Sequence, residues 1–237
     1  MGHWPEGSLR YPPHTDPPVN EALAAQVGYA PAVISLMKRL PYLDSEANFD
    51  DSKYIIGRTR WADYTSDADI AEGRHPYPYE YLRHCPDLDP WLLPLMLPRT
   101  DGWHVLLDTK LGVVRAYNTE GSQLLRNTVE WRRHGVIPAA EAHTLQWTEY
   151  RRAPLVPSAR YFTELIDTYR SLDRLPIIDA DRNDPKEKLY PSRSARHVNR
   201  RKEEQKMLLA LYRECGWPNN WRRAEFISKW EAGSYGI

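Results

Sequence analysis

Side chains suited to proton transfer or metal binding gather between residues 61 and 91. Carboxylates and imidazoles move protons and ligate metals in enzymes. Their spacing here matches no His-Glu-x-x-His, Cys-x-x-Cys or calcium-loop motif, so we predict no metal site and no cofactor. Two interpretations stay open: a metal-free binding or catalytic role, and capping of loop backbone by Asp side chains. The group is Asp63, Asp67, Asp69, Glu72, His75, His84, Cys85, Asp87 and Asp89, with His75, His84 and Asp87 as catalytic candidates.

His104 is a further catalytic candidate, and it lies in a segment with the composition of a β-strand. Because side chains alternate between the two faces of a strand, His104 shares a face with Leu106, whereas Trp103 points to the opposite face. Either face could line a pocket. A lone histidine in a strand is most often structural, and Asp108, which ends the strand, is most simply a turn former.

The choice of aromatic residues is unusual, with 9 Trp and 15 Tyr against 3 Phe. Tyr and Trp carry a polar group, so they favour half-wet positions such as pocket walls and interfaces, although the rim of an ordinary core also suits them. Several lie in the proline-broken 61–91 segment, and long segments of that kind within a domain are more often functional than filler. The predicted binding residues are Trp61, Tyr64, Tyr77, Tyr79, Tyr81 and Trp103.

A basic segment over residues 182–206 could contact phosphate groups or an acidic partner. The alternative is a solvated helix face with ion pairs to Glu203 and Glu204. Aromatic residues for a single-strand platform are scarce there, so we do not expect nucleic acid as the partner. The chain has no Gly-rich phosphate loop, Gly-x-Ser-x-Gly elbow or dinucleotide fingerprint, which excludes those enzyme classes. The basic residues are chiefly Arg182, Lys186, Lys188, Arg193, Arg196, Arg200, Arg201 and Lys202.

The net charge is zero, but it is unevenly distributed along the chain. Residues 1–120 contain 11 Lys/Arg and 17 Asp/Glu, whereas residues 121–237 contain 21 and 15. Such asymmetry can drive the head-to-tail association of a homo-oligomer. It is also compatible with two faces of one domain that neutralise each other, which is the simpler interpretation.

The clearest part of the scaffold is a β-hairpin within residues 101–121. Residues 103–107 and 113–117 are rich in β-branched, aromatic and aliphatic side chains, which is typical of strands. The polar loop between them ends in Gly112, the residue that a bulged hairpin needs at positive φ. A run at 91–97 fits a short helix or a strand, and 54–57 fits a buried strand. Apolar periodicity predicts helices near 31–40, 158–173, 195–215 and 221–231.

Five prolines between residues 5 and 18 predict that residues 1–28 form an extended arm. The rest, 29–237, has the length and apolar content of a single domain with a helical C-terminal part at about 158–231. The expected fold class is α+β, with a small antiparallel sheet around the hairpin and several flanking helices. No run of 18 apolar residues and no signal peptide occur, and there are only 2 Cys. We therefore expect a soluble cytoplasmic protein that makes no membrane contact.

A family resemblance rests on the helix before Leu40-Pro41, on Gly102, on Leu107-Asp108, and on Gly112 to Val114 with Tyr117. These features resemble the SUKH superfamily, the α+β fold of fungal cell-wall-regulator-like proteins and bacterial toxin-immunity proteins. The similarity covers about residues 29–125. The chain has Asn118-Thr119 where the family often has an acidic-histidine pair. The resemblance implies interaction with other proteins, not catalysis.

These observations support two hypotheses about function. The leading one is a protein-binding or regulatory module that engages its partner through the aromatic and acidic 61–91 segment. The alternative is a small metal-independent enzyme, of cyclase, isomerase or dehydratase type, that holds a hydrophobic metabolite in an aromatic-lined pocket. An exposed aromatic patch favours the first hypothesis, and a deep pocket with converging polar groups favours the second.

Overall fold

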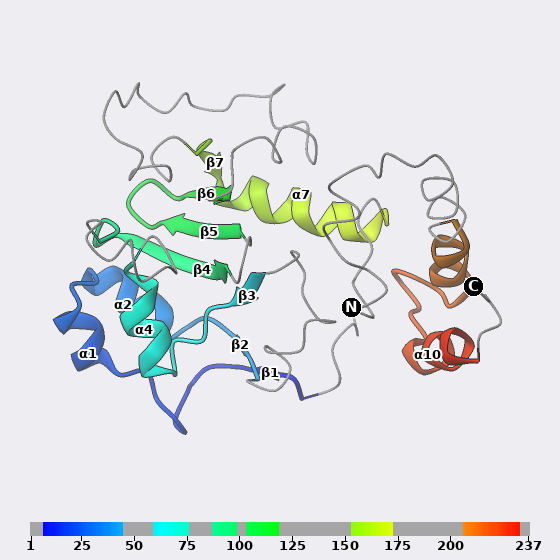
Figure 1. Cartoon of the computed structure of the whole chain (residues 1–237), viewed down its shortest axis with the longest axis horizontal. Coiled ribbons are helices and arrows are strands. Elements are labelled where there is room, and N and C mark those ends of the chain that lie inside the picture. Colours follow the sequence, from blue (N-terminus) through cyan, green and yellow to red (C-terminus); the bar gives the residue numbers. More distant parts are fainter. Residues whose placement is uncertain are drawn as a thin grey trace, which may run out of the picture. The chain divides into compact units, whose positions relative to one another are not determined.

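The computed structural model describes residues 7–44, 59–75, 87–98, 103–118, 153–172 and 206–232. The fold is α+β, as predicted (Figure 1). A five-stranded antiparallel sheet has the order β3-β4-β5-β6-β7, and a second sheet pairs β1 with β2. The strands are β1 (Leu9–Arg10), β2 (Tyr42–Leu43), β3 (Thr59–Trp61), β4 (Leu92–Pro98), β5 (Trp103–Asp108), β6 (Val113–Asn118) and β7 (Val156–Pro157).

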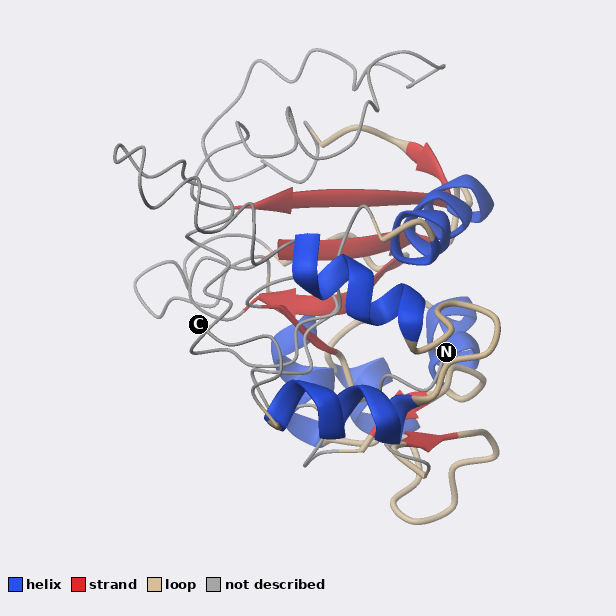
Figure 2. Cartoon of the chain, turned by 90° about the vertical axis from the view of Figure 1, so that its right-hand side faces the viewer, coloured by secondary structure: helices blue, strands red, loops and turns tan. Residues whose placement is uncertain are grey.

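The helices of the N-terminal part lie beside the β3–β4 edge of the large sheet (Figures 1 and 2). There α1 packs against α2 and α4, and α4 packs against β4. None of the helices in the described ranges combines the length and the apolar character needed to cross a membrane. The helices are α1 (Glu21–Gln26), α2 (Pro31–Met37), α4 (Asp67–Gly73), α7 (Ser158–Arg170), α10 (Arg223–Glu231) and one over residues 206–214.

The predicted hairpin is confirmed. Strands β5 and β6 pair without a break from Trp103 opposite Asn118 to Asp108 opposite Val113. Gly112 has the predicted positive φ, 68°. The buried Asp108 carboxylate accepts hydrogen bonds from the backbone amides of Lys110 and Leu111 in the hairpin turn, at 3.1 and 3.0 Å. Asp108 is therefore a turn former, which was the simplest interpretation of its position.

The run at 91–97 forms strand β4 and not a helix. Its register shifts between Pro94 and Met96, where the strand is bulged. Proline cannot donate a ladder hydrogen bond, so a bulge at this point lets the strand stay inside the sheet. The side chains of β4 from Leu92 to Leu97 are buried, which accounts for its continuous apolar sequence.

The predicted helices near 31–40, 158–173 and 221–231 correspond to α2, α7 and α10. Of the helix predicted at 195–215, the described part is helical over 206–214, and the strand predicted at 54–57 lies outside the described residues. Two parts of the fold were not predicted: α1 begins at residue 21, inside the expected extended arm, and β3 and α4 lie in or next to the segment that was expected to be irregular.

The chain divides by its internal contacts into two compact units, residues 7–162, and residues 163–237 together with 1–6. A single domain over 29–237 stays a prediction. The second unit has an aromatic core in which Tyr212 packs between Trp221 and Phe226, at ring-centroid distances of 5.1 and 4.5 Å. The Trp217 indole N–H donates to the Tyr169 carbonyl at 2.9 Å. The buried residues of this core are Leu172, Leu208, Leu211, Tyr212, Cys215, Trp217 and Phe226.

The turn at Gly216 is expected to be sensitive to any side chain. Gly216 has φ +86°, and a Cβ there would lie 2.1 Å from the Asn220 carbonyl oxygen. Gly216→Ala is therefore expected to lower the free energy of unfolding of the C-terminal unit by about 2 kcal/mol. Thermal unfolding followed by tryptophan fluorescence measures this loss. Gly112→Ala is the matched control, because Gly112 also has positive φ but open space around it. Equal losses in both variants would contradict the steric explanation.

Candidate functional site

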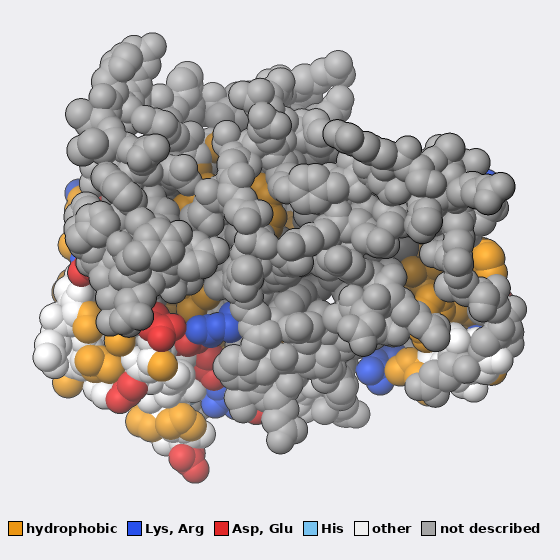
Figure 3. Space-filling model, in the orientation of Figure 1, with side chains coloured by type: hydrophobic (Ala, Val, Ile, Leu, Met, Phe, Trp, Pro, Cys, Tyr) orange, Lys and Arg blue, Asp and Glu red, His pale blue; other side chains and the backbone are white. Residues whose placement is uncertain are grey.

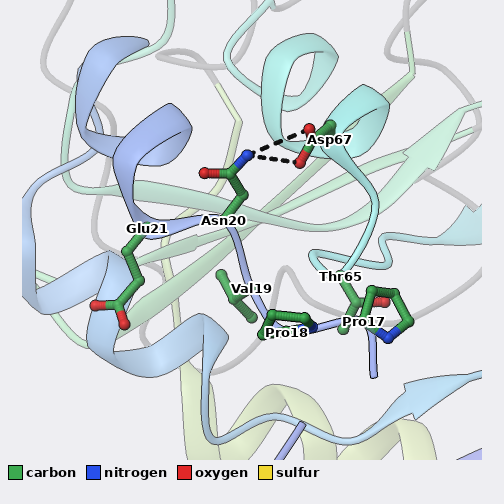
Figure 4. Close-up of a pocket in the computed structure, with 7 residues that line it drawn as sticks. All are labelled: Pro17, Pro18, Val19, Asn20, Glu21, Thr65 and Asp67. Atoms are coloured by element: carbon green, nitrogen blue, oxygen red, sulfur yellow. Dashed lines mark hydrogen bonds between the residues drawn. The ribbon is translucent and has the colours of Figure 1, made fainter. Parts of the chain in front are cut away.

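The N-terminal unit has an open hollow of about 570 Å³ between the chain before α1 and the chain before α4 (Figure 4). Two proline rings and the Val19 side chain supply apolar surface, and Asp67 and Glu21 are exposed carboxylates. Apolar walls with a few oriented polar groups are typical of binding sites. The lining residues are Pro17, Pro18, Val19, Asn20, Glu21, Thr65 and Asp67.

Asn20 joins the two sides of the hollow. It is the N-cap of α1, and its side-chain oxygen accepts a hydrogen bond from the Leu23 amide at 3.1 Å. Its Nδ2 donates to both oxygens of Asp67, at 3.1 and 3.2 Å (Figure 4). Asp67 is in the first turn of α4, where a negative charge suits the helix dipole. One side chain thus fixes the starts of α1 and α4 relative to each other.

A buried polar network holds the Thr65 wall of the hollow. The Asp63 carboxylate accepts hydrogen bonds from the Thr65 hydroxyl at 2.7 Å and from the Thr65 amide at 3.1 Å. Arg10, from β1, forms an ion pair with Asp63 and donates to the Thr65 hydroxyl at 3.2 Å. The N-terminal strand is therefore tied directly to the wall, across 53 residues of sequence.

A second ion pair is linked to the first through Asp63. Arg60 donates to both oxygens of Asp69 at 2.6 Å, and the Asp63 amide donates to Asp69 at 2.7 Å. The side chains of Arg60 and Asp69 are 13% and 7% exposed. Burial alone would lower the pKa of Arg60, but the hydrogen bonds and charge of Asp69 outweigh burial and raise it. The Arg60 guanidinium therefore stays charged in the folded protein.

Tyrosine rings form the core beneath this network. Tyr64 is 1% exposed, and its hydroxyl donates to the Pro94 carbonyl at 2.6 Å. Its ring makes edge contacts with Tyr29 and Tyr42. Burial raises the pKa of all three hydroxyls, so they stay neutral. Tyr64, a predicted binding residue, is a core residue, and its ring offers no surface to a partner.

His104 is enclosed in the large sheet. It is 3% exposed, and its ring stacks on Tyr117 across the β5–β6 pair, with centroids 4.5 Å apart. Its Nε2 has no hydrogen-bond partner in the part of the chain that is described. Burial lowers the pKa of His104 from 6.5 to about 3. A general base works best with a pKa near the working pH, so this environment does not suit His104 to proton transfer.

The remaining sequence-predicted residues are distributed over several places. Trp61 and Trp103 are half-buried and share the sheet face opposite His104, since Trp61 pairs with Met96 and Met96 with Val105. The Leu88 amide donates to the Arg74 carbonyl at 2.8 Å, which brings the chain at His75 close to the chain at Asp87. The predicted residues Tyr77, Tyr79, Tyr81 and His84 lie outside the described residues.

Among the described residues, no group of three or more His, Cys, Asp or Glu side chains is arranged to hold a metal ion. No family model matches the chain, and no match was found among curated proteins or solved structures. The geometry of the described residues is therefore the basis for the assignment of function.

Most of the hollow was not predicted from the sequence. Of its lining residues, Asp67 was a candidate as part of the acidic group, whereas residues 17–21 and Thr65 were not. One local signal was present, because Asn20 directly before Glu21 is a typical helix N-cap. The contact between Asn20 and Asp67 spans 47 residues, and no local pattern indicates it.

Proposed function

We propose that this chain is a protein-binding module and that its partner inserts a side chain into the hollow at residues 17–21 and 65–67. The observation that carries the proposal is the hollow itself, which is built partly from the predicted 61–91 segment. Because the hollow is open to solvent, it suits a side chain of another protein better than a small molecule, which binding sites usually enclose. In the space-filling view, acidic, basic and hydrophobic side chains intermingle at the lower left, where Figure 1 shows α1 and α4 (Figure 3).

Rigidity of the walls supports the same function. Asn20 bridges the two sides, and the Arg10–Asp63–Thr65 contacts hold Thr65 in the wall. A pre-organised site loses little conformational entropy when a partner binds. The resemblance to the SUKH superfamily stays a proposal that points in the same direction, because that family implies interaction.

The enzyme alternative gains no support from the contacts of His104, which is buried, neutral and stacked in the sheet. His75 and Asp87 lie where two chain segments meet, but Asp87 is exposed and no described hydrogen bond joins its carboxylate to an imidazole. Enzyme activity at these residues stays a prediction.

Site-specific photo-crosslinking tests the proposed binding function. Benzoylphenylalanine in place of Pro18 would react from the hollow, and the same group in place of Leu111, which is 59% exposed on the hairpin turn, is the control. In an extract of the source cells, we expect a discrete crosslinked protein from the Pro18 position that is absent from the Leu111 position. Excess unlabelled wild type should suppress it.

The competing variant Pro18→Trp provides the decisive comparison, since it crowds the hollow without a change of charge. It should fold, as checked by circular dichroism, but fail to suppress the crosslink. The same crosslinked protein from both positions, or equal suppression by wild type and Pro18→Trp, would overturn the proposal.

A further inference from the structure

The two carboxylates of the hollow differ in their ionic contacts within the described residues. Glu21 is paired with Lys38, whose Nζ lies 2.7 Å from Oε1. Asp67 has no cationic partner among the described residues, and the hydrogen bonds that its carboxylate accepts come from the Asn20 amide. A cationic group of a ligand would therefore find its counter-charge at Asp67.

The apolar part of the hollow is suited to an aliphatic chain. Pro17, Pro18 and Val19 form a continuous stretch that leads to Asn20 and Asp67 (Figure 4). Long cationic side chains place their methylene stem along apolar surface and keep the charged end at a polar site. Lysine and arginine both have this form, so the geometry around Asp67 decides between them.

Asn20 occupies the side of Asp67 that an arginine would need. Its Nδ2 is almost equidistant from Oδ1 and Oδ2, at 3.1 and 3.2 Å, and so lies between the two oxygens. A guanidinium binds a carboxylate best as a two-pronged fork that faces both oxygens from that same side. An ammonium is a compact point charge that can approach one oxygen from its outer side.

We infer that the hollow binds a lysine side chain of the partner protein, with Asp67 as its counter-charge and Asn20 as the residue that disfavours arginine. This inference rests on the proposed function and names the chemical group that the hollow selects. The carboxylate of Asp67 also suits the start of α4, but that role requires no selectivity between two cations.

Titration with short peptides tests the selectivity. The probes are acetylated, amidated pentapeptides of Gly and Ala with a central Lys, Arg or norleucine, followed by amide chemical shifts at residues 19–21 and 65–67. We expect the Lys peptide to bind about tenfold more tightly than the Arg and norleucine peptides, as is typical for one charge-assisted contact. Asp67→Asn should remove that advantage, whereas Glu72→Gln, on the exposed side of α4, should preserve it.

Asn20→Ser gives the sharpest test of the role of Asn20. Serine keeps the N-cap of α1 but removes the amide donor between the Asp67 oxygens. The variant should bind the Arg peptide at least as tightly as the Lys peptide. Equal binding of Lys and norleucine by wild type, or unchanged Lys preference in Asn20→Ser, would overturn the inference. A Pro18 crosslink that depends on the hollow would still leave the protein-binding function in place.

Discussion

Replacement of His104 by phenylalanine is expected to remove the part of the acid-induced loss of stability, between about pH 6.5 and pH 3, that comes from this buried imidazole. His104 is 3% exposed and stacked on Tyr117, and burial lowers its pKa from 6.5 to about 3. Phenylalanine retains a ring for the stack and does not titrate. The expected change is therefore in the pH dependence, with the fold preserved.

The direction follows from proton binding in the two states. Below pH 6.5 the unfolded chain protonates His104 and the folded chain does not, so acid favours unfolding. The stability that depends on a neutral His104 is fully present above pH 6.5. It falls as the pH drops and is lost near pH 3. A pKa shift of this size corresponds to a loss of stability on the order of 5 kcal/mol across the interval. Acid therefore unfolds the wild type earlier than the variant.

Denaturant unfolding at pH 7.5, 6, 5 and 4 measures the effect as the difference between His104→Phe and wild type. At neutral pH the variant should be as stable as wild type or more stable by about 1 kcal/mol, because the His104 Nε2 lacks a partner among the described residues. Tyr117→Phe is the matched control, since it keeps the ring stack and the His104 imidazole. Its free energy of unfolding should therefore fall with acid as steeply as that of wild type. If the free energy of unfolding depended on pH in the same way for His104→Phe and wild type, His104 could not be a buried neutral imidazole.

The hairpin was predictable because its determinants are local. Alternating β-branched and aromatic residues fill β5 and β6, and Gly112 supplies the positive φ at their junction. The longer helices α7 and α10 were predictable for the same reason, because their apolar residues repeat over several turns. Helices α1 and α4 were missed because they bury few apolar side chains, Ala24 in α1 and Ile70 in α4. Helix α2 is equally short, with 7 residues, but it buries Val33, Ile34 and Met37, and these three give it a visible apolar side.

The candidate site depends on contacts that no local pattern encodes. Asp63 and Asp69 are exposed loop acids by composition, yet they are buried, because Arg10 and Arg60 neutralise them. Tyr64 was expected at a surface for its polar hydroxyl, but the Pro94 carbonyl satisfies that hydroxyl within the core. Each of these side chains is buried because the fold brings a hydrogen-bonding or charged partner to it. The sequence contains those partners but does not indicate which residues pair.

The Arg60–Asp69 ion pair leads to the second large prediction, that Asp69→Ala destabilises the protein by about 3–5 kcal/mol. The substitution removes the carboxylate that faces both Arg60 nitrogens at 2.6 Å and the acceptor of the Asp63 amide at 2.7 Å. It thereby removes the two-oxygen acceptor of a largely buried guanidinium, since the Arg60 side chain is 13% exposed. Urea unfolding at pH 7.5 gives the loss directly.

Asp67→Ala is the matched control, because it removes a carboxylate from the same helix at an exposed position. Its loss should be about 1 kcal/mol, from the helix dipole and the bond to Asn20. The double variant Arg60→Met with Asp69→Leu should be more stable than Asp69→Ala, since it removes both charges and retains apolar volume. If Asp69→Ala and Asp67→Ala lowered the free energy of unfolding by similar amounts, the buried Arg60–Asp69 pair would contribute no more to stability than an exposed carboxylate.

Asp69 also connects stability to the proposed site. The Asp63 amide depends on Asp69, and the Asp63 carboxylate in turn holds Thr65 on the wall of the hollow. Asp69→Ala should therefore speed hydrogen exchange of the Thr65 amide by more than the global loss of stability explains, because local opening at the wall becomes easier. Asp67→Ala, which leaves the Asp63–Thr65 bonds intact, should not. This difference separates a network that merely stabilises the fold from one that also shapes the hollow.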